Sequence, residues 1–98
     1  MLDYFLTNEV FTISFTGRMD SRASADLEAE LMEKLAEINC KKVIFDLDHV
    51  DYIASTFLHI CLVIAKKIKP ENFSVINTKP HIKKTFVIAG LDQIFTIT

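Results

Sequence analysis

Glycine is scarce in this sequence. Gly17 and Gly90 are its only two glycines, in a chain of 98 residues. Loops that cradle phosphates and turns that bind dinucleotides both need several glycines at fixed spacing, because their backbone must approach the phosphates closely. The chain can build neither kind of loop, which excludes the nucleotide-binding enzymes that depend on them.

An excess of charge and the metal-binding patterns of cysteine and histidine are lacking too. The formal net charge is -2, whereas binding of nucleic acid usually needs a concentrated basic face. Cys40 and Cys61 lie far apart and match no metal-ligand spacing, so we expect buried, reduced thiols. His49, His59 and His81 form no HxxH or HExxH arrangement. We therefore expect no nucleic-acid partner, no bound metal and no cofactor.

Long hydrophobic runs are also missing. The longest uncharged stretch, from Tyr52 to Ala65, is shorter than the ~20 residues needed to span a bilayer, and a core helix explains it better. The opening MLDYFLTNEV carries an acid at Asp3 and lacks the basic region and small-residue cleavage site of a signal peptide. Length and an ordinary balance of apolar and charged residues favour one domain over residues 1–98. We predict a cytoplasmic protein without membrane insertion.

Periodicity predicts strands that alternate with helices. Polar and apolar residues alternate over Val10–Thr16, which is typical of a half-buried strand, and we expect Gly17 to end it. Further strands are expected at Tyr4–Leu6, Val43–Leu47, Phe73–Ile76 and Ile94–Ile97. Helices are expected after a cap at Ser21 or Ser24, over about Ser55 to Ile68, and from Thr78 and Pro80 to about Ala89, before Gly90. The order β-β-α-β-α-β-α-β predicts an α/β domain with a mostly parallel sheet, opened by an antiparallel hairpin.

The third expected strand ends in two acids. Val43–Leu47 is typical of a strand covered on both faces, and we expect a loop over His49–Ala54. Asp46 and Asp48 at such a strand end can bind Mg²⁺ or accept a phosphoryl group. The run FDLD superficially resembles the nucleophile motif of haloacid-dehalogenase-type phosphatases, but that motif lies near the chain start and precedes glycine, whereas His49 follows here. A small phosphatase using Asp46 and Asp48 is one alternative; a strand-end acid and a loop acid without catalytic role is the other.

Two adjacent hydroxyls mark the start of the most apolar helix. Ser55 and Thr56 lie just beyond a strand's carboxyl end, where α/β sheets usually hold their functional residues. A plain helix cap, which Ser55 alone could supply, explains the pair equally well. Steps of three and four residues from Thr56 lead along the helix to His59, Val63, Lys66 and Lys67. Such a mixed stripe fits a partner-binding face, and periodicity leaves the cap and the recognition surface both open.

Three stretches together resemble the STAS domain of anti-sigma-factor antagonists. They are FTGRMDSRASADLEAEL, VIFDLDHVDYIAST and the closing AGLDQIFTIT. The first resembles the family's G-x-x-D followed by a helix, and the second its hydrophobic-D-L-x-x-V-x-x-I-D-S-S/T-G-L pattern. Their order and spacing cover the whole chain, so the resemblance implies a STAS fold for residues 1–98.

The resemblance implies a regulatory binding protein and not an enzyme. Family members bind an anti-sigma factor or related serine/threonine kinase when unmodified and release it when phosphorylated. Thr56 matches the phosphoacceptor hydroxyl and Ser55 the hydroxyl before it. Asp20 matches the acid after the second strand, near the partner surface. We expect Asp20, Ser55, Thr56, Phe57, His59 and Val63 to bind the partner, and a phosphatase is a further candidate partner.

The sequence departs from the family pattern at two positions beside Thr56. Ala54 replaces the usual aspartate, and Phe57 replaces the usual glycine. The loss of the acid removes a group that could contact the kinase or orient the hydroxyl, and Phe57 is expected to crowd Thr56 or to add apolar contact area. These departures favour an alternative, a STAS scaffold or adaptor that binds partners without being phosphorylated.

Overall fold

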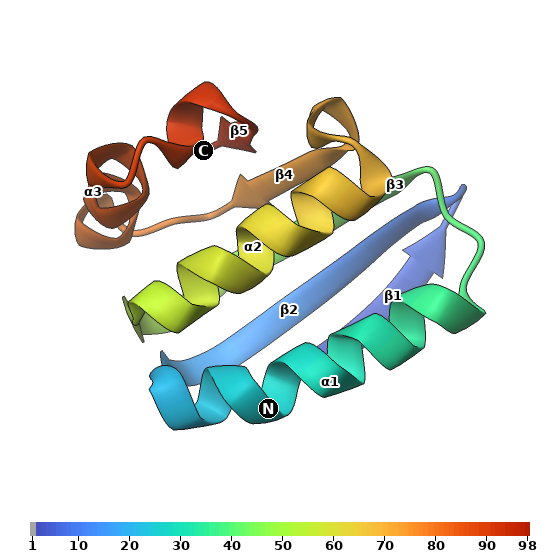
Figure 1. Cartoon of the computed structure of the whole chain (residues 1–98), viewed down its shortest axis with the longest axis horizontal. Helices are drawn as coiled ribbons and strands as arrows, with labels where there is room; N and C mark the ends of the chain where they lie inside the picture. Colours follow the sequence, from blue (N-terminus) through green and yellow to red (C-terminus); the bar gives the residue numbers. More distant parts are fainter. Residues whose placement is uncertain (1) are drawn as a thin grey trace.

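The chain folds into a five-stranded sheet with three helices on it. The structure is a computed structural model and describes residues 2–98. The strands are β1 (Leu2–Thr7), β2 (Val10–Met19), β3 (Lys42–Ile53), β4 (Phe73–Ile76) and β5 (Thr96–Ile97). The helices are α1 (Ser21–Glu37), α2 (Ser55–Ile68) and α3 (Pro80–Ile88), with short 3-10 helices η1 (Pro70–Asn72) and η2 (Leu91–Gln93). Figure 1 shows their arrangement.

The strands lie in the sheet in their order along the chain. β1 pairs with β2 antiparallel, and β2, β3, β4 and β5 pair parallel to one another. Asn8 and Glu9 form the two-residue turn of the opening hairpin, both with positive φ (51° and 67°), as a type I′ turn requires. The predicted α/β order with an antiparallel hairpin is confirmed.

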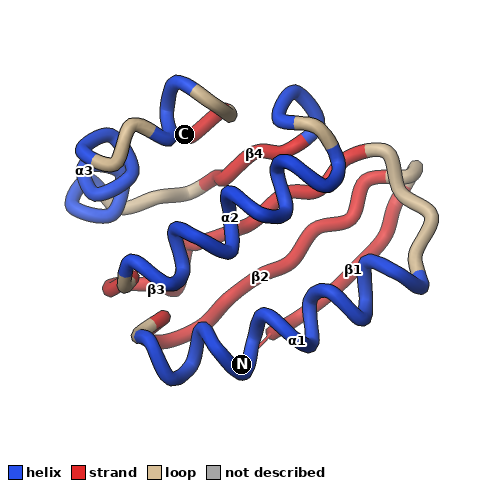
Figure 2. Tube along the Cα trace, in the orientation of Figure 1, coloured by secondary structure: helices blue, strands red, loops and turns tan. Residues whose placement is uncertain are grey.

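The helices cover one face of the sheet. α1 and α2 lie side by side across it (Figure 2), and the residues of β2 alternate between buried Phe11, Ile13 and Phe15 and partly exposed Thr12 and Ser14. Each parallel crossover advances one strand in the same direction. Because such crossovers are right-handed, all of them place their helices on the same side.

The second face of β3 is therefore open, which contradicts the expectation of a strand covered on both faces. Val43, Phe45 and Leu47 are buried, whereas Ile44 and Asp46 between them are only partly so. The nearly continuous apolar run of this strand had suggested helices on both sides.

A chain of phenylalanine rings fills the core between sheet and helices. Edge-to-face pairs join Phe15 to Phe45 (centroids 4.8 Å apart), Phe45 to Phe73 (4.9 Å) and Phe73 to Phe95 (4.8 Å). Such pairs each contribute about 0.5–1.5 kcal/mol beyond the area they bury. α2 adds Phe57, whose ring lies 5.3 Å from that of Phe15. These contacts fix α2 against the centre of the sheet.

Three strands run further than the sequence predicted, and the first of them, β1, spans Leu2–Thr7 instead of Tyr4–Leu6. β2 does not end at Gly17 but continues to Met19, and the predicted loop His49–Ala54 is strand as far as Ile53. The register between β2 and β3 shifts after Ser14 and again after Gly17, and Gly17 adopts φ +102°. Bulges of this kind interrupt the alternation of buried and exposed residues. The polar segment after Asp48 breaks the alternation of period two, and for that reason it was predicted to be a loop.

The remaining boundaries are close to prediction. β4 and α2 have the predicted bounds, and Gly90 follows α3 with φ +80°. β5 is shorter than predicted, because residues 91–95 are taken up by η2 and a turn. Cys61 is fully buried and Cys40 half-buried, both as free thiols, and burial raises the pKa of each. No helix within residues 2–98 is both long and apolar enough to cross a membrane.

Candidate functional site

The starts of α1 and α2 meet at the carboxyl ends of β2 and β3. Both helix starts lie at the same end of the molecule in Figure 1. The backbone N–H of Ala54 donates to the carbonyl oxygen of Met19 at 2.8 Å, and the Ser24 hydroxyl approaches the same oxygen at 3.5 Å. One carbonyl at the end of β2 thus links the first turn of α1 to the residue that precedes α2.

Asp20 holds the first turn of α1. Its carboxylate oxygen Oδ1 accepts the N–H of Ala23 at 2.9 Å, and its carbonyl accepts the N–H of Ser24 at 2.9 Å. Asp20 is therefore the helix cap, and the predicted caps Ser21 and Ser24 are wrong: Ser21 is the first helical residue and Ser24 is buried. The Asp20 side chain is exposed beside the start of α2.

The two hydroxyls at the start of α2 do not cap it. Ala54 occupies the cap position with extended backbone (φ -96°, ψ 168°), and no side chain caps the helix. Ser55 is already the first helical residue, so the interpretation of Ser55 as a cap is wrong. Ser55 and Thr56 are both exposed, and neither hydroxyl has a hydrogen-bond partner within residues 2–98. Capping therefore cannot explain this hydroxyl pair.

A groove of about 320 Å³ runs between the first turns of α1 and α2. Its lining residues are Ser24, Ala25, Glu28, Ser55, Thr56, His59 and Ile60. α1 contributes one acid, Glu28, and α2 contributes the two hydroxyls and the imidazole of His59. Thr56 and His59 are exposed on its α2 side. The groove is open to solvent, and hydroxyl, imidazole and carboxylate side chains are among the residues that line it.

The structure brings together all the expected contact residues except one. Ser55, Thr56 and His59 are exposed on α2, Val63 is half-buried further along it, and Asp20 lies at the start of the neighbouring helix. Phe57 is fully buried. It neither crowds Thr56 nor adds surface area, because at the first turn of α2 its ring points into the core, against Phe15 and Phe45. We therefore do not include Phe57 in the candidate surface.

Sequence reasoning missed an aromatic-cation pair near the carboxyl ends of β2 and β3, on the face of the sheet away from the helices. The Arg18 guanidinium carbon lies 4.3 Å from the centre of the Tyr52 ring, and the two residues face each other in β2 and β3. Tyr52 is 41% exposed. Tyr and Arg are the side chains most enriched among residues that dominate binding energy. The pair was hidden because Tyr52 fell in a predicted loop and Arg18 beyond the predicted end of a strand.

Glu28 was missed for a different reason. It lies four residues after Ser24, and one turn of helix brings both to the groove side of α1. Helical spacing from Ser24 could have pointed to it, but an acid on an amphipathic helix usually belongs to the solvated face. Glu28 lines a groove only because α2 packs beside α1, and this packing cannot be read from the spacing within α1.

Asp46 and Asp48 take part in hydrogen bonds that connect β3 to the segment before α3. The Asp46 carboxylate oxygen Oδ1 accepts the N–H of Asp48 at 3.0 Å and the side-chain amide of Asn77 at 3.1 Å. Lys79 donates to the carbonyl oxygens of Asp48 (2.8 Å) and Val50 (3.1 Å). No group of three metal-ligating side chains occurs in the described part of the chain. These bonds tie β3 to the segment before α3, and the phosphatase alternative gains no geometric support.

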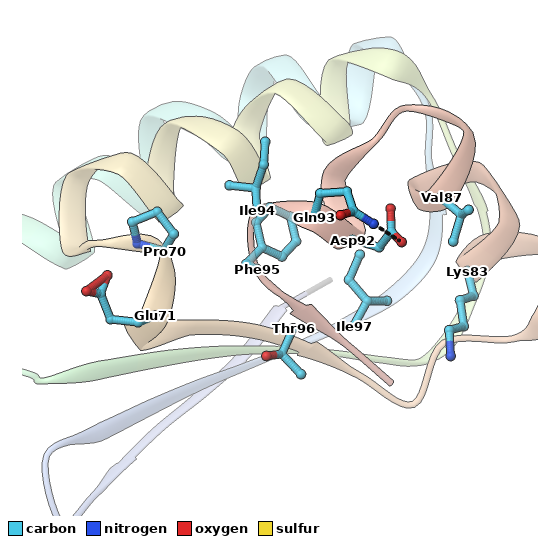
Figure 3. Close-up of a pocket in the computed structure, with 10 residues that line it drawn as sticks. All are labelled: Pro70, Glu71, Lys83, Val87, Asp92, Gln93, Ile94, Phe95, Thr96 and Ile97. Carbon is cyan, nitrogen blue, oxygen red and sulfur yellow. Dashed lines mark hydrogen bonds between the residues drawn. The ribbon is translucent and has the colours of Figure 1, made fainter.

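A second hollow, of about 530 Å³, lies at the β5 edge of the sheet. Figure 3 shows its walls, which come from η1, α3, η2 and β5. Its charged residues, Glu71, Lys83 and Asp92, stand apart on its rim, and the one hydrogen bond drawn there joins the neighbours Asp92 and Gln93. None of its residues comes from α1 or from α2, so it is separate from the groove at Thr56.

The chain belongs to the STAS domain family, whose model matches residues 5–98. A Bordetella bronchiseptica protein, BtrV, which bears the name of an anti-sigma factor antagonist, is 31% identical over 83 residues, or 83% of this chain and 71% of BtrV. Among solved structures, an anti-sigma factor antagonist from Mycobacterium paratuberculosis superposes with a TM-score of 0.87 at 22% identity, covering 99% of this chain and 83% of that one.

The antagonist SpoIIAA has the same fold in two states. Its unphosphorylated form superposes with a TM-score of 0.84, covering all of this chain and 88% of SpoIIAA, and its phosphorylated Bacillus form with 0.74, covering all of this chain and 91% of that one. Both are 16% identical to this chain. At that identity the likeness concerns the fold, and it agrees with the sheet order and helix positions described above.

Proposed function

We propose that this protein is an anti-sigma-factor antagonist. In this proposal it binds an anti-sigma factor or a related serine/threonine kinase through the surface around Thr56, and phosphorylation of Thr56 ends the binding. The observation that carries the proposal is the exposed Thr56 hydroxyl, which has no hydrogen-bond partner among residues 2–98 and lies on the rim of a groove. The likeness to BtrV supports the choice of partner class. The protein acts by binding and catalyses no reaction.

The contact surface comprises residues from α1, α2, β2 and β3. Thr56, Ser55 and His59 of α2 face the partner, with Val63 further along the helix. Glu28 of α1 lies on the opposite side of the groove, and Asp20 is the exposed cap residue just before that helix. We add Arg18 and Tyr52, which pair with each other near the carboxyl ends of β2 and β3. An exposed hydroxyl on a fixed helix start can reach a kinase active site while the surrounding residues hold the partner.

Phosphorylation changes binding more than it changes the fold. A phosphate on Thr56 adds about -1.5 to -2 charges at neutral pH. The first turn of α2 holds no acid, so the helix dipole favours this charge by roughly 0.3–1 kcal/mol. A charge left unpaired in an interface costs more, on the order of 3 kcal/mol, or over a hundredfold in affinity. The interface term is the larger one, and the partner is released from a domain that stays folded.

Kinase assays test this proposal. The partner is first isolated from native cell extract with the protein as bait, and the purified kinase is then incubated with ATP and the wild type, Ser55→Ala or Thr56→Ala. We expect mass spectrometry to find phosphate on Thr56 in wild type and in Ser55→Ala, and none in Thr56→Ala. Phosphate on Ser55 alone would move the switch by one residue. Tight binding of a competent kinase without phosphorylation would contradict the switch.

An adaptor that binds without being phosphorylated is the second candidate. Ala54 favours it, because the cap position beside Thr56 carries no acid that could orient the hydroxyl. The two candidates differ in one result, since an adaptor binds its partner equally well before and after incubation with ATP.

A further inference from the structure

The outer edge of β1 is a long strand edge that lacks several of the usual forms of protection, although Asp3 lies in the strand and α1 overhangs one face of it. β1 has six residues, whereas the opposite edge strand, β5, has two. Proteins protect exposed edges with very short strands, lysine, proline or bulges, because unpaired backbone groups recruit other strands. β1 (LDYFLT) is not short and contains neither lysine nor proline, and its pairing with β2 is regular throughout. Of the two edge strands, only β5 is short enough to be protected in this way.

The turn geometry determines which backbone groups face outward. In a two-residue hairpin the residues that flank the turn, Thr7 and Val10, exchange both backbone hydrogen bonds. Bonded and non-bonded pairs then alternate, so Phe5 and Asp3 also bond to β2. The N–H and C=O groups of Tyr4 and Leu6 point away from β2. They form the donors and acceptors of the free edge.

Two large apolar side chains lie beside this edge. Phe5 is 57% exposed on the open face of the sheet and Leu6 is 48% exposed on the helix face. On the helix face Tyr4 is covered by α1: its hydroxyl donates to the Glu30 carboxylate, and the Lys34 ammonium nitrogen lies 5.6 Å from the centre of its ring. The edge therefore offers free backbone groups flanked by apolar contact area on both faces.

We propose that two copies of this chain pair through their β1 strands, antiparallel about a twofold axis at Phe5. In this register Tyr4 of one copy exchanges backbone hydrogen bonds with Leu6 of the other. The two Phe5 side chains oppose each other in a non-bonded pair, the closest position for cross-strand contact. Asp3 lies opposite Thr7, so no like charges face each other along the strands. The register one pair lower would place Asp3 against Phe5 instead and would leave the aromatic pair unmade.

The α1 helices make this pairing weak and salt-dependent. Asp26, Glu30, Glu33 and Glu37 recur at helical spacing along the side of α1 that overhangs β1, where Glu30 contacts Tyr4. Lys34 is the one cation among these four acids. Twofold pairing of the β1 strands brings the two acidic stripes to the same face of a continuous sheet. Their repulsion is screened as ionic strength rises. One six-residue strand also covers less area than the roughly 1,200 Å² of a standard interface, so we expect a dissociation constant of about 100 µM.

The dimer leaves the surface around Thr56 free in both copies, so that each copy can bind a partner molecule. Thr56 lies at the carboxyl ends of β2 and β3, away from the outer edge of β1. The antiparallel arrangement places the two Thr56 surfaces at opposite ends of one sheet. A dimer can hold two partner molecules at once, which raises effective affinity where the partner is itself paired or clustered. This inference goes beyond the proposed function and does not depend on it.

Sedimentation equilibrium of the purified full chain between about 5 and 500 µM tests the pairing. At 500 mM NaCl we expect a monomer-dimer equilibrium with a dissociation constant several-fold lower than at 50 mM. Phe5→Lys should abolish it. Leu6→Pro should abolish it too, since proline removes an outward N–H that β2 does not use. Ile88→Lys, which changes the most exposed apolar side chain, on α3 (76%), is the matched control and should dimerise as wild type does.

Two results would overturn the proposal. One is a monomer at every concentration and salt, which would leave the edge to a strand from a different protein. The other is a dimer that persists in folded Phe5→Lys and Leu6→Pro but is lost in Ile88→Lys, which would place the interface on α3. Circular dichroism and thermal unfolding of each variant verify that the fold is retained.

Discussion

The backbone N–H of Ala54 donates to the carbonyl oxygen of Met19 at 2.8 Å, and this bond joins the residue before α2 to the end of β2. Asp20 follows directly and caps α1. The two helix starts are thus held from adjacent residues, which explains why Thr56 and Glu28 line one groove. A change at Ala54 or Asp20 should therefore be measurable both in stability and at the binding surface.

Ala54→Ser should stabilise the domain. The cap position of α2 has the right backbone conformation but no side-chain oxygen, and a serine there can accept an N–H from the first turn. Replacement of alanine by serine at helix caps contributes about 1 kcal/mol. Urea unfolding should show a higher midpoint with an unchanged slope. An unchanged or lower midpoint would mean that the first turn of α2 cannot use a cap.

Two variants separate the capping role of Asp20 from its proposed role in partner binding. Asp20→Ala removes the cap and should lower the free energy of unfolding by about 1 kcal/mol. Asp20→Asn keeps an oxygen for the Ala23 N–H and should cost much less stability, while it removes the charge. If the charge contacts the partner, Asp20→Asn binds more weakly than wild type at nearly full stability. Equal binding by wild type and Asp20→Asn would restrict Asp20 to capping.

Phe57 should matter for stability and not for recognition. Its ring is fully buried among Phe15 and Phe45, so Phe57→Ala should cost about 3–5 kcal/mol. Phe57→Leu keeps most of the apolar volume and should stay folded. Its affinity for the partner, measured by calorimetry, should equal that of wild type within about twofold, or less than 0.5 kcal/mol. A large loss of affinity in folded Phe57→Leu would show that the core position affects the surface.

Tyr4 should make stability fall at high pH. Desolvation, then the hydrogen bond to Glu30 and the Glu30 charge, raise the pKa of Tyr4 above its ordinary value. The Tyr4 hydroxyl ionises near pH 10 in the unfolded chain, whereas in the folded protein it stays neutral at that pH. The stabilisation from Tyr4 is thus complete below pH 10 and is lost as the pH rises above it. Unfolding free energies between pH 9 and 11.5 should decline more steeply for wild type than for Tyr4→Phe, and parallel curves would contradict this assignment.

The sequence was sufficient to predict the architecture, because the apolar residues of most strands and helices recur at the spacing typical of each element. Regular alternation in β2 and the long apolar run of α2 led to the correct element order. The bulges between β2 and β3 could not be foreseen, since they depend on how two distant segments pair. Arg18 and Tyr52 were missed as a pair for that reason, although each was visible in the sequence.

The site was predicted in part. Its place in the chain was predicted correctly, whereas the side-chain orientation of one residue and the cap of one helix were not. The start of α2 and Thr56 were located correctly. The orientation of Phe57 was not, because Phe57 was assigned to the partner surface from its place beside Thr56 in the family motif, although the stripe at steps of three and four from Thr56 does not include it. The cap of α1 was assigned to a serine because the strand before it was expected to end at Gly17; β2 in fact continues to Met19, which leaves Asp20 as the one residue between strand and helix.

The central claim is that a charge on Thr56 controls partner binding without changing the fold. Calorimetric titration of the isolated partner with wild type, Thr56→Ala and Thr56→Glu tests it most directly, with thermal unfolding of all three as the control for folding. We expect Thr56→Ala to bind as wild type does and Thr56→Glu to bind at least tenfold more weakly, or more than about 1.4 kcal/mol, at nearly unchanged stability. Equal affinities of Thr56→Glu and wild type would contradict the account.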